Sequence, residues 1–431
     1  MSFSVFINHT GSSAINFKSL PAQRRLTEAL CHRDYGLSLT LPDDRLCPPV
    51  SLVVICFYFY LMPDTLEGSS AGNLMCRLNY ILWLQDIVIS TCGSNTIRGF
   101  DIGTGASAIY PLLACRLEPT WSFIATDIDD RSIQSAKQNI AQNSMEGRIV
   151  IEHMQADDAI LQPLHTSQMD FDFVMCNPPF YSSTEDVSRS AEFKELGPNA
   201  ICSGAEVEMI TPGGETSFVA RIFSESLQLR TKCRWYTSML GKMSSIPDVV
   251  SLFREHNVDN YAITEFVQGQ TRRWAIGWSF QDARLSDTIA RISNPALQNI
   301  MPSRNTLHHS FPSARPANTL ESVLRNVLAI VDGLLVTSTS ATPESSSTTM
   351  LVRAQGNTWS RAARRKRLPA AVSADQEPPV LRCSIECCSK VDTPCEIIFT
   401  WLEGKDRSVF ESFTSHVSRK VISTLRELGD E

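Results

Sequence analysis

The sequence predicts an α/β protein with a mostly parallel seven-stranded sheet, followed by a small C-terminal α+β module. Three observations support this fold class. From Ile97 the chain alternates between short apolar runs and helical patterns, which is typical of a parallel sheet. A glycine-rich turn, GFDIGTGAS, joins the first apolar run to the first helical pattern. After Pro379, alternating apolar residues precede a last helical pattern, which indicates a second folded unit.

Each expected element follows from its own apolar pattern. Strands are expected at 96–103, 122–128, 148–154, 171–177, 234–240, 262–267 and 272–280. Helices are expected at Pro21–His32, 77–90, Ala108–Leu117 and Arg131–Asn143. In the tail, the runs LRCSIEC and CEIIFTWLE predict strands, and a helix is expected from Ser408 to about Leu428.

Changes in composition divide the chain into regions. Two stretches rich in Ser and Pro, 281–319 and 337–349, indicate linkers or surface loops. The expected regions are 1–50, basic and helical; 51–76, an atypical insert; 77–285, the α/β domain; 286–350, a partly disordered linker; 351–378, a basic linker; and 379–431, the small auxiliary module.

Composition also limits the class of protein. A chain of 431 residues that is 43% hydrophobic and 20% charged is typical of two or three soluble domains. Its net charge of −7 requires any nucleic-acid contact to come from local basic patches. The 13 cysteines lack the paired spacing of zinc sites, so we expect reduced thiols, with structural zinc a minor alternative. The apolar run at 51–62 is too short to span a bilayer.

The glycine-rich turn has the composition of a cofactor site. Gly103 and Gly105 allow a tight turn and a close approach of the backbone to a ligand. Asp127 ends the next strand, where a carboxylate can accept both hydroxyls of a ribose. The spacing departs from GxGxxG, which favours a nucleoside with an amino-acid tail over a dinucleotide. Arg77 and Ser107 are candidate partners of that tail's carboxylate, with a plain turn and a solvated arginine as the alternatives.

The motif NPPF at Asn177–Phe180 follows a fully apolar strand. Ligands of open α/β sheets lie at the carboxyl ends of the strands, so this motif is expected to face the same crevice as the glycine turn. The Asn177 side-chain oxygen and the Pro178 carbonyl can each accept a hydrogen from an aromatic amine. Pro178 and Pro179 stiffen the turn, and Phe180 offers a face for stacking a base. The motif therefore predicts methyl transfer to an amine by positioning, with an ordinary proline-rich turn as the alternative.

Several long blocks resemble one family. Over roughly residues 17–280 the chain is similar to the methyltransferase-10-domain family, through RLNYILWLQDIV, RGFDIGTGASAIYPLLAC, ATDIDD, CNPPF, SLQLRTKCRWYTSMLGK and TEFVQGQTRRWAIGWSF. The family contains eukaryotic adenine-N6 methyltransferases of U6 small nuclear RNA and bacterial relatives that act on large-subunit ribosomal RNA. The resemblance implies a Rossmann-like class I methyltransferase fold and S-adenosylmethionine as cofactor. The tail, with GNTWSRAARRKR, is similar to fungal members.

The resemblance also implies roles for single residues. Asp157 departs from it, since relatives often have threonine there. The segment 202–216 resembles the family's mobile loop over the active site, with Gly204, Gly213 and Gly214 as hinges and a plain surface loop as the alternative. The implied cofactor contacts are Arg77, Gly103, Ser107, Asp127, Asp157 and Asn177, joined by Gly105 of the turn, and the catalytic group is Asn177, Pro178, Pro179 and Phe180.

The insert at 51–76 interrupts the resemblance, because relatives run almost directly from LCPPVP into the RLNY helix. We hypothesise that it is translated intron or a gene-model error. Reads of the mature transcript that span codons 51–76 would refute this. A genuine insert would lie beside Arg77 and could disturb the cofactor pocket.

Basic residues gather in three stretches that, taken singly, are typical of solvated faces. If they flank the NPPF crevice together, they can clamp an RNA stem by its phosphates. The cluster at 361–367 is expected to bind RNA or to direct nuclear import, and the module at 379–431 resembles, more weakly, an auxiliary RNA-binding domain. The expected RNA contacts are Lys18, Arg24, Arg25 and Arg33; Arg230, Lys232, Arg234 and Lys242; and Arg272 and Arg273.

These patterns together predict an S-adenosylmethionine-dependent RNA adenine-N6 methyltransferase. U6 small nuclear RNA is the favoured substrate and the nucleus the favoured compartment, with the cytoplasm as the alternative. Neither a metal nor a membrane is expected as a partner. Other readings stay open, namely a ribosomal RNA substrate, a protein glutamine methylated through the same motif, and an RNA-binding scaffold with an inactive pocket.

Overall fold

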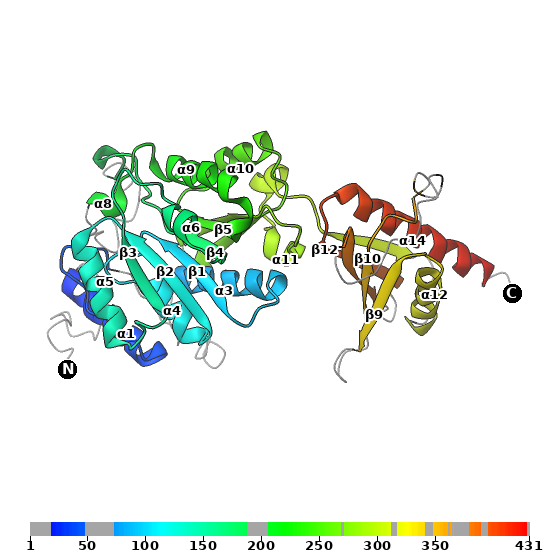
Figure 1. The fold of residues 1–431 in the computed structure, drawn as a ribbon, viewed down its shortest axis with the longest axis horizontal. Helices are drawn as coiled ribbons and strands as arrows, with labels where there is room; N and C mark the ends of the chain where they lie inside the picture. The colour runs from blue at the N-terminus through cyan, green and yellow to red at the C-terminus, as the bar shows by residue number, and fades with distance from the viewer. Residues whose placement is uncertain are drawn as a thin grey trace, which may run out of the picture. The chain divides into compact units, whose positions relative to one another are not determined.

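The computed structural model divides the chain into two compact units (Figure 1). It describes residues 19–47, 73–187, 206–268, 271–311, 317–340, 348–360, 379–388 and 395–428, together with residues 363 and 365. The first unit comprises Met1–Gln281 and Arg291–Pro302, and the second comprises Asp282–Ala290 and Ser303–Glu431. Most of the insert at 51–76 and of the basic cluster at 361–367 lies outside the described residues.

The first unit is built on a seven-stranded sheet of order β3-β2-β1-β4-β5-β7-β6. Only β7 runs against the other strands of this sheet, since it is antiparallel to both of its neighbours. This confirms the predicted mostly parallel sheet, and every strand end lies within two residues of its expected position. The strands are β1 Ile97–Ile102, β2 Trp121–Asp127, β3 Ile149–His153, β4 Phe171–Cys176, β5 Cys233–Leu240, β6 Tyr261–Gln268 and β7 Thr271–Trp278.

Helices cover both faces of this sheet. Figure 1 shows α3, α4 and α5 on one side and α6, α9 and α10 on the other. Strands covered on both faces are buried along most of their length, as β1 and β4 are, although β1 contains Arg98 and Asp101 and β4 contains Asp172. The helices and helical turns are α1 Leu20–Tyr35, α3 Asn73–Thr91, α4 Ile109–Leu117, α5 Asp130–Gln142, α6 Gln162–Thr166, α8 Glu206–Met209, α9 Gly214–Leu229, η2 Arg230–Lys232, α10 Ser245–Glu255 and η3 Pro295–Ile300.

The second unit is a five-stranded antiparallel sheet packed against two helices. Its strand order is β8-β12-β11-β10-β9, and its core includes Trp359, Phe399 and Phe413. The predicted α+β module is therefore present. Its elements are α11 Asp287–Ala290, β8 Thr306–Phe311, α12 Ala317–Ala329, β9 Leu334–Ser340, β10 Thr348–Ala354, β11 Leu381–Cys388, β12 Cys395–Glu403 and α14 Arg407–Glu427.

The linkers expected at 286–350 and 351–378 are corrected by these elements. The second unit begins long before residue 379, because β8, α12, β9 and β10 all belong to its fold. The Ser- and Pro-rich composition concealed a helical pattern. The buried residues of α12 recur at helical spacing, at Leu320, Val323, Leu324, Val327 and Leu328.

The described part of the chain was also searched for metal and membrane features. It holds no helix that is long and apolar enough to cross a membrane. Within the same residues, no group of three or more His, Cys, Asp or Glu side chains has the arrangement of a metal site. The cysteines whose side chains are placed are free thiols, and most of them are buried.

Gly99→Ala is expected to destabilise the first unit, because β1 passes between two aromatic rings there. An added Cβ would lie 2.5 Å from the ring of Phe123 and 2.7 Å from that of Phe173. Such overpacking costs about 1–3 kcal/mol. Urea unfolding measures it, with Gly147→Ala as the control, since no heavy atom lies within 4 Å of the added Cβ there. Equal stabilities for the two variants would contradict the expected packing.

Candidate active site

The glycine turn is fixed to the end of β2. Gly103 and Gly105 have φ of 68° and 65°, the left-handed region that glycine adopts without strain. The Thr104 N–H donates to the Thr126 carbonyl at 2.9 Å. The Gly105 N–H donates to an Asp127 carboxylate oxygen at 2.8 Å. The sharp turn therefore joins the carboxyl ends of β1 and β2 at one edge of the sheet.

Asp127 is held in one orientation by two backbone donors. Its second carboxylate oxygen accepts the Asp129 N–H at 3.0 Å. Burial raises the pKa of Asp127, and the hydrogen bonds from Asp129 and Gly105 oppose that rise. A carboxylate has more acceptor sites than these two bonds use, so Asp127 can still accept the two hydroxyls of a ribose.

A cavity of about 480 Å³ opens beside this turn, which is a volume typical of small-molecule sites. Arg77 from α3, Ser107 after the glycine turn, and Asp127 all line it. The Arg77 guanidinium lies 5.3 Å from the centre of the Tyr110 ring. The structure thus brings the predicted carboxylate-binding and ribose-binding residues into one pocket.

Asp101 is a buried acid that sequence reasoning passed over. It is 1% exposed, and one of its carboxylate oxygens has no hydrogen-bond partner among the described residues. Burial raises its pKa to about 7, and the nearby charge of Asp127 adds to the rise, while a Thr104 hydrogen bond and the Arg77 charge oppose it. The sequence did contain a signal for Asp101, because this residue lies in the block RGFDIGTG that resembles the family.

The NPPF motif begins where β4 ends, at the same edge of the sheet. The Tyr80 hydroxyl lies 2.7 Å from the Thr237 hydroxyl and accepts the Cys176 N–H at 3.4 Å. These contacts fix the backbone directly before Asn177. The Asn177 side-chain oxygen is buried without a hydrogen-bond partner among the described residues. Asn177, Pro178 and Pro179 line the cavity, so the structure presents an unused acceptor to any ligand there.

Phe180 lies beyond the cavity wall, against the turn that follows β5. A Cβ on Gly241 would lie 2.7 Å from its ring, and the Arg273 guanidinium lies 5.5 Å from the ring centre. The buried Glu215 holds this turn by accepting from the Gly241 N–H at 2.6 Å and the Lys242 N–H at 2.9 Å. Phe180 therefore packs against a turn that is itself held in place. Its role in stacking a base stays a prediction.

The described part of the segment 202–216 is attached to the residue after the motif. The Tyr181 N–H donates to the Met209 carbonyl at 3.0 Å, and the Thr211 N–H donates to the Tyr181 carbonyl at 2.9 Å. Gly213 and Gly214 have left-handed backbones, as hinges would, while Gly204 lies outside the described residues. Glu208, Ile210, Thr211 and Pro212 also line the cavity, so this segment borders both the cofactor pocket and the motif.

Comparison with protein families decides the class. A family model described as RNA methyltransferase matches residues 1–71 and 55–282. The chain belongs to this family. It is 36% identical over 410 residues to the U6 small nuclear RNA (adenine-(43)-N(6))-methyltransferase of Schizosaccharomyces pombe, and the match covers 94% of each chain. It is 37% identical over 283 residues to the human RNA N(6)-adenosine-methyltransferase METTL16, covering 64% of this chain and 46% of that protein.

Solved structures support the same assignment. The crystal structure of the hMettl16 catalytic domain in complex with MAT2A 3'UTR hairpin 1 matches 65% of this methyltransferase at 35% identity, with a TM-score of 0.54 and 88% of that chain covered. The complex with hairpin 6 matches with a TM-score of 0.51. The first unit of the methyltransferase therefore has the Rossmann-like class I fold, as predicted.

The residues of the cavity fit S-adenosylmethionine, the cofactor of this methyltransferase. Arg77 can pair with a carboxylate, Asp127 can accept ribose hydroxyls, and the unused Asn177 oxygen lies where an amine must approach. Asp157, however, is exposed and does not line the cavity, whereas Asp158 does. Asp157 is thus not among the residues that line the cavity, and its expected contact to the cofactor's adenine stays a prediction.

The N-terminal arginines expected to bind RNA are paired within the methyltransferase. Arg24 is 5% exposed and donates to an Asp43 carboxylate at 3.0 Å, which corrects its expected role because a buried side chain cannot reach a phosphate. Arg25 pairs with Glu28 at 2.8 Å, and Arg33 pairs with Asp34 at 2.6 Å. Lys18 lies outside the described residues.

The remaining basic residues lie at two opposite edges of the sheet. Arg230, Lys232 and Arg234 lie at the start of β5, so they are far from the carboxyl ends that carry NPPF. The expectation that all three stretches flank the crevice is therefore wrong for these residues. Lys232 contacts Asp170 at 3.4 Å, and Arg234 contacts Asp172 at 3.1 Å.

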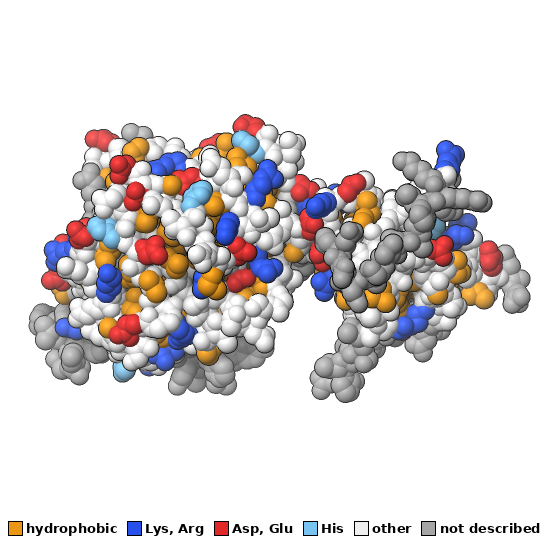
Figure 2. All heavy atoms as spheres, viewed as in Figure 1, with side chains coloured by type: hydrophobic (Ala, Val, Ile, Leu, Met, Phe, Trp, Pro, Cys, Tyr) orange, Lys and Arg blue, Asp and Glu red, His pale blue; other side chains and the backbone are white. Residues whose placement is uncertain are grey.

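Lys242, Arg272 and Arg273 lie at the edge of the sheet where β4 ends and NPPF begins, which we call the catalytic edge. Because β7 is antiparallel to β5, its first residues lie beside the last residues of β5, with Leu240 opposite Trp274. Lys242 contacts an Asp186 carboxylate at 3.0 Å, and Arg272 contacts Glu265 at 3.0 Å. Figure 2 shows basic and acidic side chains interspersed over the face of the first unit that it draws, in line with the net negative charge.

Asp101→Asn is expected to remove a pH-dependent part of the stability. Because the pKa of Asp101 rises from 3.8 to about 7 on folding, the folded state binds the extra proton between these values. Its ionisation therefore lowers the free energy of unfolding progressively from about pH 4 to about pH 7. Urea unfolding of the protein without cofactor, at several pH values, should show a steeper decline for wild type than for the variant. If the free energy of unfolding depended on pH equally in the two proteins, the raised pKa of Asp101 would be contradicted.

Proposed function

We propose that this methyltransferase transfers the methyl group of S-adenosylmethionine to the N6 amine of an adenine in structured RNA. The observation that carries the proposal is the buried side-chain oxygen of Asn177 beside the cofactor cavity, which no described residue pairs. An unpaired acceptor costs about 1–3 kcal/mol when buried, so its retention favours a ligand that donates to it. The named activities of the relatives from S. pombe and human support the same reaction.

The chain's own residues contribute mainly by positioning. The adenine amine is a poor nucleophile because its lone pair is delocalised into the ring. Accepting one amine hydrogen at Asn177 and the other at the Pro178 carbonyl favours a pyramidal nitrogen with an available lone pair. When bound, S-adenosylmethionine supplies a sulfonium methyl group as electrophile. The stiff Pro178–Pro179 turn keeps both acceptors in place during transfer, so the barrier falls without a strong base.

Structured RNA is the partner that the proposal requires, and U6 small nuclear RNA is the favoured member. The relative from S. pombe, which matches over nearly its whole length, bears that substrate in its name. Human METTL16 is named more broadly, and its catalytic domain has been crystallised with two RNA hairpins. A U6 substrate places the enzyme in the nucleus. Target bases must leave their stack to reach the Asn177 oxygen.

Asn177→Ala is expected to lower the rate of RNA methylation by about a hundredfold to a thousandfold, as the loss of a transition-state hydrogen bond does. Cofactor affinity should fall much less than the rate, because Arg77 and Asp127 remain while the implied contact of Asn177 with the cofactor is lost. Transfer of labelled methyl groups to U6 transcripts measures the rate, and calorimetry measures the affinity. Asn95→Ala, at an exposed position before β1, is the matched control. A folded Asn177→Ala enzyme with full activity would disprove the proposed role.

The same labelled cofactor distinguishes the competing functions. Incubation with total RNA and protein from the source cells should label U6 small nuclear RNA at adenine N6. Label on large-subunit ribosomal RNA would show that ribosomal RNA is the substrate. Label on protein alone would favour glutamine methylation through the same motif. Absence of cofactor binding in calorimetry would favour an RNA-binding scaffold.

Arg273→Gln is expected to weaken RNA binding, because Arg273 lies at the catalytic edge over Phe180. Loss of one phosphate contact should lower the affinity several-fold and reduce the slope of log affinity against log salt by about 1. Arg234→Gln is the matched control, since Arg234 lies at the opposite edge and contacts Asp172. Fluorescence anisotropy with a U6 hairpin at several salt concentrations measures both. Equal losses in the two variants would contradict the assignment of RNA to the catalytic edge.

A further inference from the structure

The segment 36–47, which links α1 to the insert, lies along α5 and reaches the cofactor cavity. The Ser38 N–H donates to the Asn143 side chain at 2.9 Å, and the Thr40 N–H donates to the Asn139 side chain at 2.7 Å. Asn139 is fully buried and also donates to the Ala106 carbonyl of the glycine turn at 3.1 Å. This N-terminal segment is therefore part of the wall behind the glycine turn.

Arg45 is the side chain of the segment with the most hydrogen bonds. Its guanidinium donates to an Asp129 carboxylate oxygen at 3.0 and 2.8 Å, to the Ser132 hydroxyl at 3.2 Å and to an Asp44 carboxylate at 2.8 Å. Arg45 is 9% exposed. A lysine ammonium could not make these contacts together, because they use the planar fork of the guanidinium.

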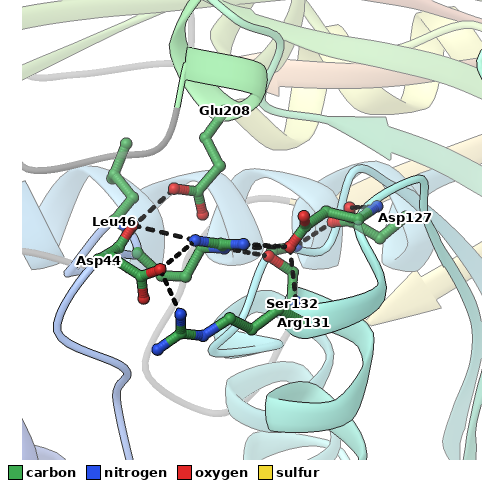
Figure 3. A network of polar contacts seen from close by, with 9 residues as sticks. Asp44, Leu46, Asp127, Arg131, Ser132 and Glu208 are labelled. Atoms are coloured by element: carbon green, nitrogen blue, oxygen red, sulfur yellow. Dashed lines mark hydrogen bonds and ion pairs between the residues drawn. The ribbon is translucent and has the colours of Figure 1, made fainter.

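The contacts of Arg45 lead directly to the ribose-binding acid. Asp129 caps α5 by accepting the Ser132 N–H at 2.7 Å, and its own N–H donates to Asp127 at 3.0 Å. The orientation of Asp127 thus depends on the position of the Asp129 backbone, which Arg45 holds through the Asp129 carboxylate. Figure 3 shows this network of polar contacts, with Asp44, Ser132 and Asp127 labelled in it.

The next residue reaches the other side of the cavity. The Leu46 N–H donates to a Glu208 carboxylate oxygen at 2.9 Å, and Leu46 and Glu208 both line the cavity. Glu208 directly precedes the Met209 carbonyl that accepts the N–H of Tyr181, the residue after the motif. Two consecutive residues of the N-terminal segment therefore contact both the ribose side of the cavity and the loop beside the motif.

We propose that Arg45 is a positioning residue of the cofactor site, which orders Asp127 through Asp129 and, through the adjoining Leu46–Glu208 contact, ties the loop beside NPPF to the cofactor pocket. This inference rests on the proposed function, since it assigns the pocket to S-adenosylmethionine. It changes the role of the region 1–50, which sequence patterns assign to RNA alone. Arg45 acts on cofactor affinity and does not touch RNA.

Arg45→Gln tests the proposal. Calorimetric titration with S-adenosylmethionine and with S-adenosylhomocysteine should show dissociation constants raised about tenfold, as the loss of a charge-assisted contact does. The Michaelis constant for the cofactor should rise, while RNA affinity measured without cofactor should stay unchanged. Arg131→Gln is the matched control, because Arg131 contacts Asp44 at the exposed rim of the same network and its side chain is 59% exposed.

A second variant covers the case in which Arg45→Gln fails to fold. Asp129→Asn keeps a good cap on α5, since asparagine and aspartate cap helices equally well, but it removes the charge that Arg45 contacts. It should raise the same dissociation constants. The double variant should bind S-adenosylmethionine no more weakly than the more affected single variant, because both substitutions break the same interaction.

The possible outcomes separate this inference from the proposed function. A wild-type protein that binds no S-adenosylmethionine would overturn the proposed function. Wild-type binding with folded Arg45→Gln or Asp129→Asn variants whose dissociation constants lie within twofold of it would overturn the positioning role alone. A variant that loses RNA affinity but keeps its cofactor affinity would also overturn the positioning role. That result would assign the segment 36–47 to RNA binding.

Discussion

The side-chain oxygen of Asn177, buried and without a hydrogen-bond partner in the part of the chain that the structure describes, is the constraint on which the rest of the site depends. Folding ordinarily pairs such an acceptor, since leaving it bare costs about 1–3 kcal/mol. Here the strand before it is pinned by the Tyr80 hydroxyl, and the turn after it is stiffened by two prolines. The side chain therefore cannot relax toward another donor. A site that stabilises an amine only as its nitrogen becomes pyramidal requires such rigidity.

Support for this acceptor comes from segments far apart in the chain. Glu215 fixes the turn behind Phe180, and the segment ending at Leu46 fixes the loop on the other side. Both use a buried or half-buried carboxylate that accepts backbone N–H groups. Such contacts hold backbone positions, so they constrain where a loop lies and not only which side chain it presents. The active site is thus an assembly of backbone segments, held by acids that do not themselves react.

The sequence predicted the features that depend on residues close together in the chain better than those that depend on contacts between distant residues. The sheet, the glycine turn and NPPF were predictable because each depends on residues close together in sequence and on the shared edge of parallel strands. The role of Arg24 was not, because its pairing with Asp43 depends on how the chain folds back. The misassignment of Arg234 was avoidable, because the expected strand 234–240 begins at that residue, whereas NPPF follows the carboxyl end of its strand. Whether Asp157 or Asp158 lines the cavity was not predictable either, since only the backbone path decides it.

The sheet order separates two ligands of opposite charge. The cavity is lined by the acids Asp127, Asp158 and Glu208 and also by Arg77 and Arg221, with Asp101 buried near the end of β1. On the β5–β7 side lie Lys242, Arg272 and Arg273. Lys242 pairs with Asp186 and Arg272 with Glu265, so Arg273 is the basic residue that the proposed function relies on for an RNA phosphate, while the acids of the cavity favour the sulfonium of the cofactor. Because β4 lies between β1 and β5, its Asn177 lies at the boundary. The positions of the two charge groups along the sheet therefore help to define the direction from which each ligand approaches the reacting nitrogen.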